Sequence, residues 1–129
     1  MNENAERQLA ILDDDVHLCA FMREVAQLAG FRTSVAHDGR DLAQLLASAP
    51  EILLLDLAMP HVDGVEVIRQ LAQSHFAGSV VLISGFDPLM LESTKMLAEM
   101  QGVRVAGVLS KPIDAQTLLG MLESLKRPI

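Results

Sequence analysis

Acidic side chains follow two short apolar runs of the chain, where they could hold a cation. Asp13, Asp14 and Asp15 come directly after the first run, and Asp56 ends another. Carboxylates crowded into one pocket repel one another and raise at least one pKa unless a cation compensates. Oxygen ligands suit Mg²⁺, which keeps several waters, and Mn²⁺ fits the same spacing. The four aspartates therefore predict a divalent-cation site, with one of the first three capping a helix instead.

A hydroxyl and an ammonium group follow two later apolar runs. Ser84-Gly85 alone is typical of a turn, and Lys111 alone is typical of an exposed side chain. Beside an acidic pocket, the Ser84 hydroxyl could instead donate to a phosphoryl oxygen, and Lys111 could supply a counter-charge. The Lys111-Pro112 bond is a candidate for the cis form, because the trans preference of such bonds is small.

These side chains need a framework that gathers them at one edge, and the apolar periodicity predicts one. Short apolar runs alternate with segments of helical spacing, which implies right-handed crossovers and an α/β fold. We expect a flavodoxin-like (βα)5 three-layer sandwich with a five-stranded parallel sheet in the order 2-1-3-4-5, which binds ligands at the carboxyl ends of its strands. Strands are expected at residues 9–12, 31–36, 52–55, 80–83 and 103–109, and helices at residues 18–29, 42–46, 65–71, 89–100 and 113–125.

Length and composition point to one domain over residues 1–129. The 129 residues are 50% hydrophobic, which is enough to bury a core. Residues 1–7 are expected to form a flexible N-terminus, and residues 126–129 could begin a linker. The net charge of −7 disfavours direct nucleic-acid binding, which depends on basic side chains. Cys19 is the single cysteine, so an internal disulfide is excluded and a role in helix packing is expected.

Several classes of protein are disfavoured by missing motifs. No apolar run approaches the roughly 18 residues of a membrane span, so we expect a soluble, cytoplasmic protein with no membrane partner. The sequence contains no nucleophile elbow, Walker loop, HExxH or GxGxxG, and its four histidines lack a metal-ligand pattern. A serine hydrolase or a nucleotide-binding enzyme therefore has no support.

Four motifs in order give the chain a family resemblance that covers nearly all of its length. It resembles the receiver domain of bacterial two-component response regulators, in which an aspartate accepts a phosphoryl group from a histidine kinase or histidine phosphotransferase. Each motif is common by itself, and the order on successive strand ends makes the set specific. The motifs are ILDDD at 11–15, LLLDLAMPHVDG at 53–64, VLISG at 81–85 and LSKP at 109–112.

The resemblance implies a role for each residue of the expected site. Asp56 would be the phosphoacceptor, and Ser84 and Lys111 would contact the phosphoryl group. The domain would then be a signalling switch rather than a conventional enzyme. The implied ligands of Mg²⁺ are Asp13, Asp14, Asp56 and the backbone carbonyl of Ala58.

The resemblance also implies how a signal leaves the site. Phosphorylation would draw Ser84 and Lys111 inward and shift the face formed by the fourth and fifth strands and the helices that follow them. Receivers usually carry Tyr or Phe three residues before the lysine, where this chain has Val108. The usual rotating aromatic switch is therefore not expected.

The expected partners include an output domain or a separate output protein. The segments ISGFD, LAEMQGVRVAGVLSKP and PHVDGVEVIRQLA are similar to receivers that precede EAL-type cyclic-di-GMP phosphodiesterase domains, so an EAL domain is one such output. A homodimer is also compatible with the family.

Two alternatives stay open on the residues alone. One is a phosphorylation-independent interaction module that keeps the fold and the pocket, and the complete set of site residues weighs against it. The other is a small phosphatase with an aspartate nucleophile, of the haloacid dehalogenase type. That class carries a second aspartate two positions after the first, where this chain has Ala58.

Overall fold

The strands of this protein form one parallel sheet in the order β2-β1-β3-β4-β5, as the apolar periodicity predicts. The structure is a computed structural model that describes residues 7–60, 63–85 and 87–126. The central strand is buried at all five of its positions, because helices cover both faces of the sheet. The strands are β1 (Arg7–Leu12), β2 (Phe31–Ala36), β3 (Ile52–Asp56), β4 (Ser79–Ser84) and β5 (Arg104–Ser110).

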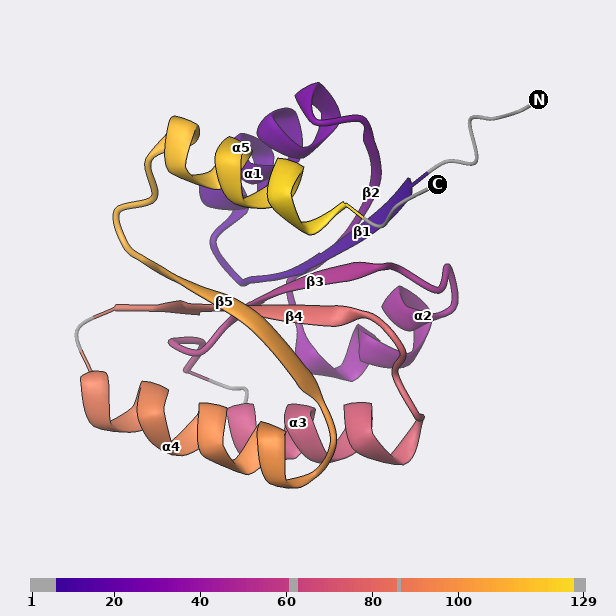
Figure 1. Cartoon of the computed structure of the whole chain (residues 1–129), viewed down its shortest axis with the longest axis vertical. Helices are drawn as coiled ribbons and strands as arrows, with labels where there is room; N and C mark the ends of the chain where they lie inside the picture. Colours follow the sequence, from indigo (N-terminus) through magenta and orange to yellow (C-terminus); the bar gives the residue numbers. More distant parts are fainter. Residues whose placement is uncertain (1–6, 61–62, 86, 127–129) are drawn as a thin grey trace.

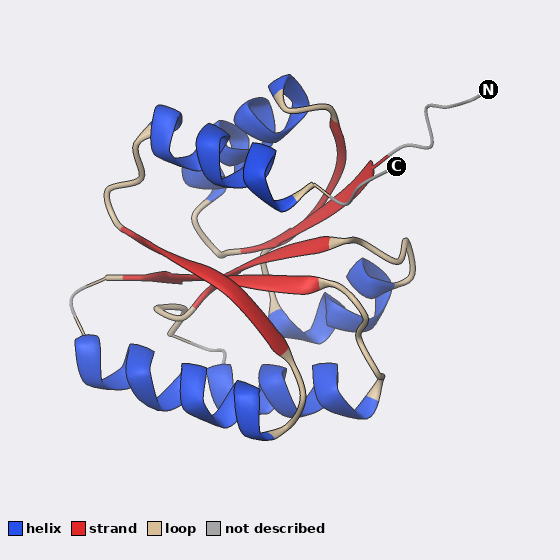
Figure 2. Cartoon of the chain, in the orientation of Figure 1, coloured by secondary structure: helices blue, strands red, loops and turns tan. Residues whose placement is uncertain are grey.

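The helices lie in two layers, one on each side of the sheet (Figures 1 and 2). One layer holds α1 (Val16–Leu28) and α5 (Ala115–Leu125), and the other holds α2 (Leu42–Leu46), α3 (Gly64–Gln73) and α4 (Pro88–Met100). Each layer closes its own apolar core. Alternate residues of β3 serve the two cores, with Leu54 in the core under α1 and α5 and Leu53 in the core on the other side. The flavodoxin-like three-layer fold is confirmed.

Most differences from the expected elements lie at their ends. Gly30 follows α1 with a φ of +92°, which is the left-handed conformation expected of a glycine after a helix. The second helix covers Leu42–Leu46 as expected, and a 3-10 turn at residues 39–41 precedes it. The described residues do not include 1–6 or 127–129. They also leave out three residues of the motifs quoted above, which are His61, Val62 and Phe86.

The first and last described residues lie at the amino end of the strands. Arg7, expected in a flexible segment, is the first residue of β1, where it pairs with Phe31 and forms an ion pair with Glu51 at 3.1 Å. Lys126, just after α5, lies beside Gly30. Both residues are therefore at the opposite end of the sheet from Asp13 and Asp56. Among the described residues, no helix is long and apolar enough to cross a membrane.

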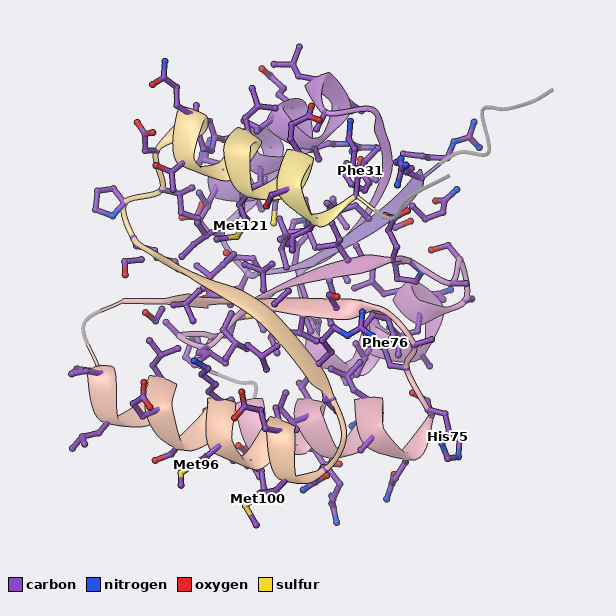
Figure 3. The ribbon with its side chains drawn as sticks, viewed as in Figure 1. Phe31, His75, Phe76, Met96, Met100 and Met121 are labelled. Carbon is purple, nitrogen blue, oxygen red and sulfur yellow. The ribbon has the colours of Figure 1, made fainter. Side chains whose placement is uncertain are left out.

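Methionines of α5 and α4 lie in different surroundings. Met121 of α5 packs onto β5, where Gly107 leaves room for it: a Cβ at Gly107 would lie 3.1 Å from the methionine Cε. Met96 and Met100 of α4 point away from the sheet and are exposed (Figure 3).

Candidate functional site

The carboxyl ends of the strands bring the predicted side chains to one edge of the sheet. Asp13 follows β1, Asp56 and Ser84 are the last residues of β3 and β4, and Lys111 follows β5. Asp14 joins them, because Asp13, Asp14 and Asp56 each offer a carboxylate oxygen and these three oxygens lie within 4.8 Å of one another. Parallel strands all end at this edge, which is why residues so far apart in the chain meet here.

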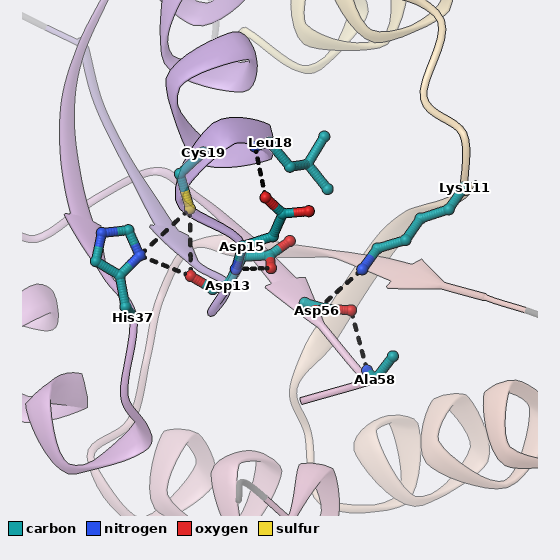
Figure 4. Close-up of polar contacts among 8 residues, drawn as sticks. All are labelled: Asp13, Asp15, Leu18, Cys19, His37, Asp56, Ala58 and Lys111. Carbon is teal, nitrogen blue, oxygen red and sulfur yellow. Dashed lines mark hydrogen bonds and ion pairs between the residues drawn. The ribbon is translucent and has the colours of Figure 1, made fainter. Parts of the chain in front are cut away.

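Asp56 is a buried carboxylate held by two hydrogen-bond donors (Figure 4). Its side chain is 1% exposed, and its Oδ2 accepts a hydrogen bond from Lys111 Nζ at 3.2 Å. Its Oδ1 accepts one from the backbone N–H of Ala58 at 3.0 Å. The described contact of Ala58 thus uses its N–H, whereas the family resemblance implies its carbonyl as a metal ligand.

Lys111 faces the acidic pocket as a cation. Partial burial lowers the pKa of its ammonium group, and the negative charges of Asp56 and Asp13 outweigh that effect, so the pKa is raised above its ordinary value. Lys111 therefore stays charged at neutral pH and offsets part of the repulsion between the carboxylates.

Asp13 is the most unusual aspartate of the group. It is fully buried, and its Oδ1 accepts a hydrogen bond from the backbone N–H of Asp15 at 2.9 Å. The pKa of Asp13 is raised from 3.8 to about 6: burial raises it most, the hydrogen bond from Asp15 lowers it, and the nearby charge of Asp56 raises it. Its Oδ2 has no hydrogen-bond partner in the part of the chain that the structure describes. A buried, unpartnered carboxylate oxygen beside two further carboxylates fits the oxygen-rich ligand set of Mg²⁺.

Asp15 serves the helix rather than the pocket. Its side chain accepts a hydrogen bond from the backbone N–H of Leu18 at 3.0 Å and forms the N-cap of α1. The prediction that one of the three consecutive aspartates caps the helix is confirmed.

Ser84 is buried and links two strand ends. Its backbone carbonyl accepts a hydrogen bond from the Lys111 N–H at 2.9 Å, and it is 7% exposed. Together with Ala58 and Met90, it lines a small pocket of about 70 Å³ beside the start of α4. The bond between Lys111 and Pro112 has the cis form for which the sequence makes it a candidate.

Two neighbours of Asp13 were not expected at this site. The backbone carbonyl of Asp13 lies 3.2 Å from the Cys19 thiol and 2.9 Å from His37 Nδ1. Burial raises the pKa of the Cys19 thiol to about 12, and the surrounding carboxylates add to the effect, so the thiol stays protonated. No pattern in the sequence indicated these contacts, because they depend on where β1 and β2 end beside each other.

Comparison with known proteins gives one consistent result. The family model of the response regulator receiver domain matches residues 9–123. The transcriptional regulatory protein CpxR of Escherichia coli strain K12 is 33% identical over 75 residues, which cover 58% of this chain and 32% of CpxR. The C4-dicarboxylate transport transcriptional regulatory protein DctD of Pseudomonas aeruginosa is 30% identical over 127 residues, which cover 98% of this chain and 26% of DctD. This chain thus corresponds to about a third or less of either relative.

Solved structures agree in fold. A response regulator from Colwellia psychrerythraea superposes with a TM-score of 0.82 at 33% identity, covering 94% of this chain and 97% of that one. A signal receiver domain from Bermanella marisrubri superposes with a TM-score of 0.76 at 29% identity, covering 93% and 98%. The match extends over almost the full length of each chain.

Proposed function

Since this chain belongs to the response regulator receiver domain family, we propose that Asp56 accepts a phosphoryl group in a Mg²⁺-dependent reaction. The domain then acts as a switch in two-component signalling rather than as a conventional enzyme. The observation that carries the proposal is the buried carboxylate of Asp56, which lies between Lys111 and the Asp13–Asp14 pair. A lone buried aspartate would need only a counter-charge, whereas this one has an ammonium group and two further carboxylates around it.

The acidic side chains would hold the cation. The ligands are Asp13, Asp14 and Asp56, with the carbonyl of Ala58 as a fourth in line with the family resemblance. When bound, Mg²⁺ neutralises charge on the transferring phosphoryl group. The unpartnered Oδ2 of Asp13 supports this assignment, because an ionised buried oxygen is costly unless a cation or a donor satisfies it.

The transfer itself is a displacement at phosphorus. A carboxylate oxygen of Asp56 forms a bond to phosphorus as the bond from phosphorus to the donor breaks, which yields an acyl phosphate. With a phosphohistidine donor, the broken bond is to an imidazole nitrogen, which keeps the electron pair. Lys111 then moves its hydrogen bond from the carboxylate to a phosphoryl oxygen, and the Ser84 hydroxyl donates a second one.

The signal then passes to the face formed by β4, α4, β5 and α5. Ser84 and Lys111 are already joined through the backbone hydrogen bond of 2.9 Å, so a shift at the phosphoryl group moves the ends of β4 and β5 together. Val108 is partly buried against the core on the α4 side and has no ring to rotate. The relay in this chain therefore uses the strand ends rather than an aromatic side chain.

The partners follow from the same proposal. The phosphoryl donor is a histidine kinase or a histidine phosphotransferase, and the acceptor of the signal is an output domain or output protein, with an EAL domain as one candidate. CpxR and DctD are named transcriptional regulatory proteins, and the parts of them that this chain does not cover are the place for such an output. We also propose that the protein is cytoplasmic, that residues 1–129 form a single domain, and that the domain can form a homodimer.

Intact-mass measurement after incubation with acetyl phosphate and Mg²⁺ tests the proposal. We expect the wild type to gain the mass of one phosphoryl group, and we expect EDTA to prevent the gain. Asp56→Asn should show no gain. Asp114→Asn is the matched control, since Asp114 caps α5 outside the site, and it should be phosphorylated like the wild type.

Three outcomes would contradict the proposal in different ways. An unchanged mass in folded wild type would favour the interaction module. An adduct that persists in Asp56→Asn would place the acceptor elsewhere. Steady turnover of a small phosphate ester would favour the phosphatase.

A further inference from the structure

The backbone of Asp13 is fixed by groups from two other elements. Its N–H donates to the carbonyl of Ala36 at the end of β2, at 3.1 Å. Its carbonyl oxygen lies beyond the last paired residue of β1, and in the part of the chain that the structure describes no backbone N–H donates to it. The Cys19 thiol of α1 and Nδ1 of His37 approach this oxygen instead, at 3.2 and 2.9 Å (Figure 4).

The acceptor determines which ring nitrogen of His37 carries a proton. A carbonyl oxygen can only accept, so Nδ1 of His37 must carry the proton in this contact. Cys19 Sγ lies 3.7 Å from the same nitrogen, and the thiol hydrogen therefore points to the carbonyl rather than to the ring. His37 and Cys19 act together as two donors on one oxygen.

The peptide that these donors hold is the one that joins the two acids. The carbonyl of Asp13 and the N–H of Asp14 belong to one planar unit, so the orientation of the carbonyl fixes the direction in which Asp14 leaves β1. The Asp13 side chain starts from the same unit, and its carboxylate lies within 4.8 Å of the carboxylates of Asp14 and Asp56. A rotation of this peptide would move both acids relative to Asp56.

We propose that His37 is a positioning residue for the cation site: its Nδ1–H, together with the Cys19 thiol, holds the Asp13–Asp14 peptide and so sets the affinity for Mg²⁺. This inference rests on the proposed binding of Mg²⁺ by these acids. His37 touches neither the cation nor the phosphoryl group. It is an exposed residue that also lines the pocket between β2 and α2, so it connects that surface to the acidic pair.

Calorimetric titration of the full chain with MgCl₂ tests the proposal, since the sequence contains no Trp or Tyr to report binding by fluorescence. Loss of one hydrogen bond predicts that His37→Ala binds Mg²⁺ about two- to tenfold more weakly than the wild type. His37→Asn should restore the affinity to within about twofold, because an amide nitrogen can donate from nearly the place of Nδ1.

Val103→Ala is the control for a general loss of stability. Val103 is buried just before β5, at the opposite end of the sheet, so its truncation should destabilise the protein without changing the affinity for Mg²⁺. Equal affinities in wild type and folded His37→Ala would overturn the proposal. So would a His37→Asn variant that binds as weakly as His37→Ala.

A second measurement needs neither a cation nor a variant. Nitrogen–proton correlation NMR of the wild type should show His37 with its proton on Nδ1 when the ring is neutral. A neutral ring protonated only on Nε2 would overturn the proposal, whatever the affinities. If the wild type binds Mg²⁺ but is not phosphorylated, the proposed function fails alone, and if it binds no Mg²⁺, both fail.

Discussion

At the scale of single residues, Asp13 combines full burial with incomplete hydrogen bonding. A fully buried carboxylate with one unpartnered oxygen is favourable only when it is protonated or when a cation satisfies it. Because burial raises the pKa of Asp13 to about 6, the cation-free protein at neutral pH holds an ionised group in an unfavourable place. Binding of a cation at the proposed site would relieve this cost.

A pH dependence of stability follows from this aspartate. Its pKa is about 6 in the folded protein and 3.8 in a free chain, so the folded state binds the proton more tightly and loses stability as the pH rises between these values. In EDTA, Asp13→Asn should remove this loss and raise the free energy of unfolding at pH 7 by roughly 1–3 kcal/mol. Urea denaturation followed by circular dichroism at pH 4, 5, 6 and 7 measures it. Parallel pH profiles for the two proteins would contradict the raised pKa.

Much of the candidate site could be predicted from the sequence, because the rule that places it is topological. Once Asp13, Asp56, Ser84 and Lys111 were assigned to strand ends, a parallel sheet brought them together. The contacts of His37 and Cys19 could not be predicted, because they depend on the direction of single side chains around one carbonyl. The use of the Ala58 N–H is a detail of the same kind.

At the scale of elements, the helices begin in a common way. An aspartate accepts a hydrogen bond from the first turn of each of the four longer helices, which satisfies one of the free N–H groups there. Part of the net charge of −7 therefore has a structural role outside the acidic cluster of Asp13, Asp14 and Asp56. The caps are Asp15 for α1, Asp63 for α3, Asp87 for α4 and Asp114 for α5.

Element positions followed from periodicity, and their ends depended on local chemistry. The buried run of β3 was predicted correctly because four consecutive apolar residues before an aspartate fit a strand covered on both sides. The 3-10 turn at Gly39–Asp41 was not predicted, since the side chain of Asp38 accepts a hydrogen bond from Arg40 N–H and starts a tighter turn than the apolar spacing suggests.

Two glycines should respond in opposite ways to the same substitution. A Cβ at Gly78 would lie 2.6 Å from the carbonyl oxygen of Pro50, so Gly78→Ala should cost roughly 1–3 kcal/mol of stability. Gly120 is exposed within α5 and has open space around it, so Gly120→Ala should stabilise by about 0.5–1 kcal/mol through helix propensity. Thermal denaturation of both variants checks the pair. A stable Gly78→Ala would mean that the loop before β4 is not held against the loop before β3.

At the scale of the whole molecule, the acidic site should couple cation binding to folding. Mg²⁺ bound only by the folded state should add about 1.4 kcal/mol of stability at ten times its dissociation constant. For a chain of this length, that corresponds to a rise in Tm of roughly 5 °C. Thermal melts with MgCl₂, and with NaCl at equal ionic strength as the control, measure the effect. Asp14→Asn should lose most of the rise, and an equal rise in NaCl would point to general screening instead.

The placement of Arg7 and Lys126 at the amino end of the strands bears on how this domain can be joined to other polypeptides. A tether attached at either residue would start about 20 Å from the acidic edge, the length of a six-residue strand. A bulky fusion at either point would leave the acidic edge open to the proposed phosphoryl donor. The same placement means that a covalently attached neighbour could sense the state of Asp56 only through the body of the fold or by bending back over its surface.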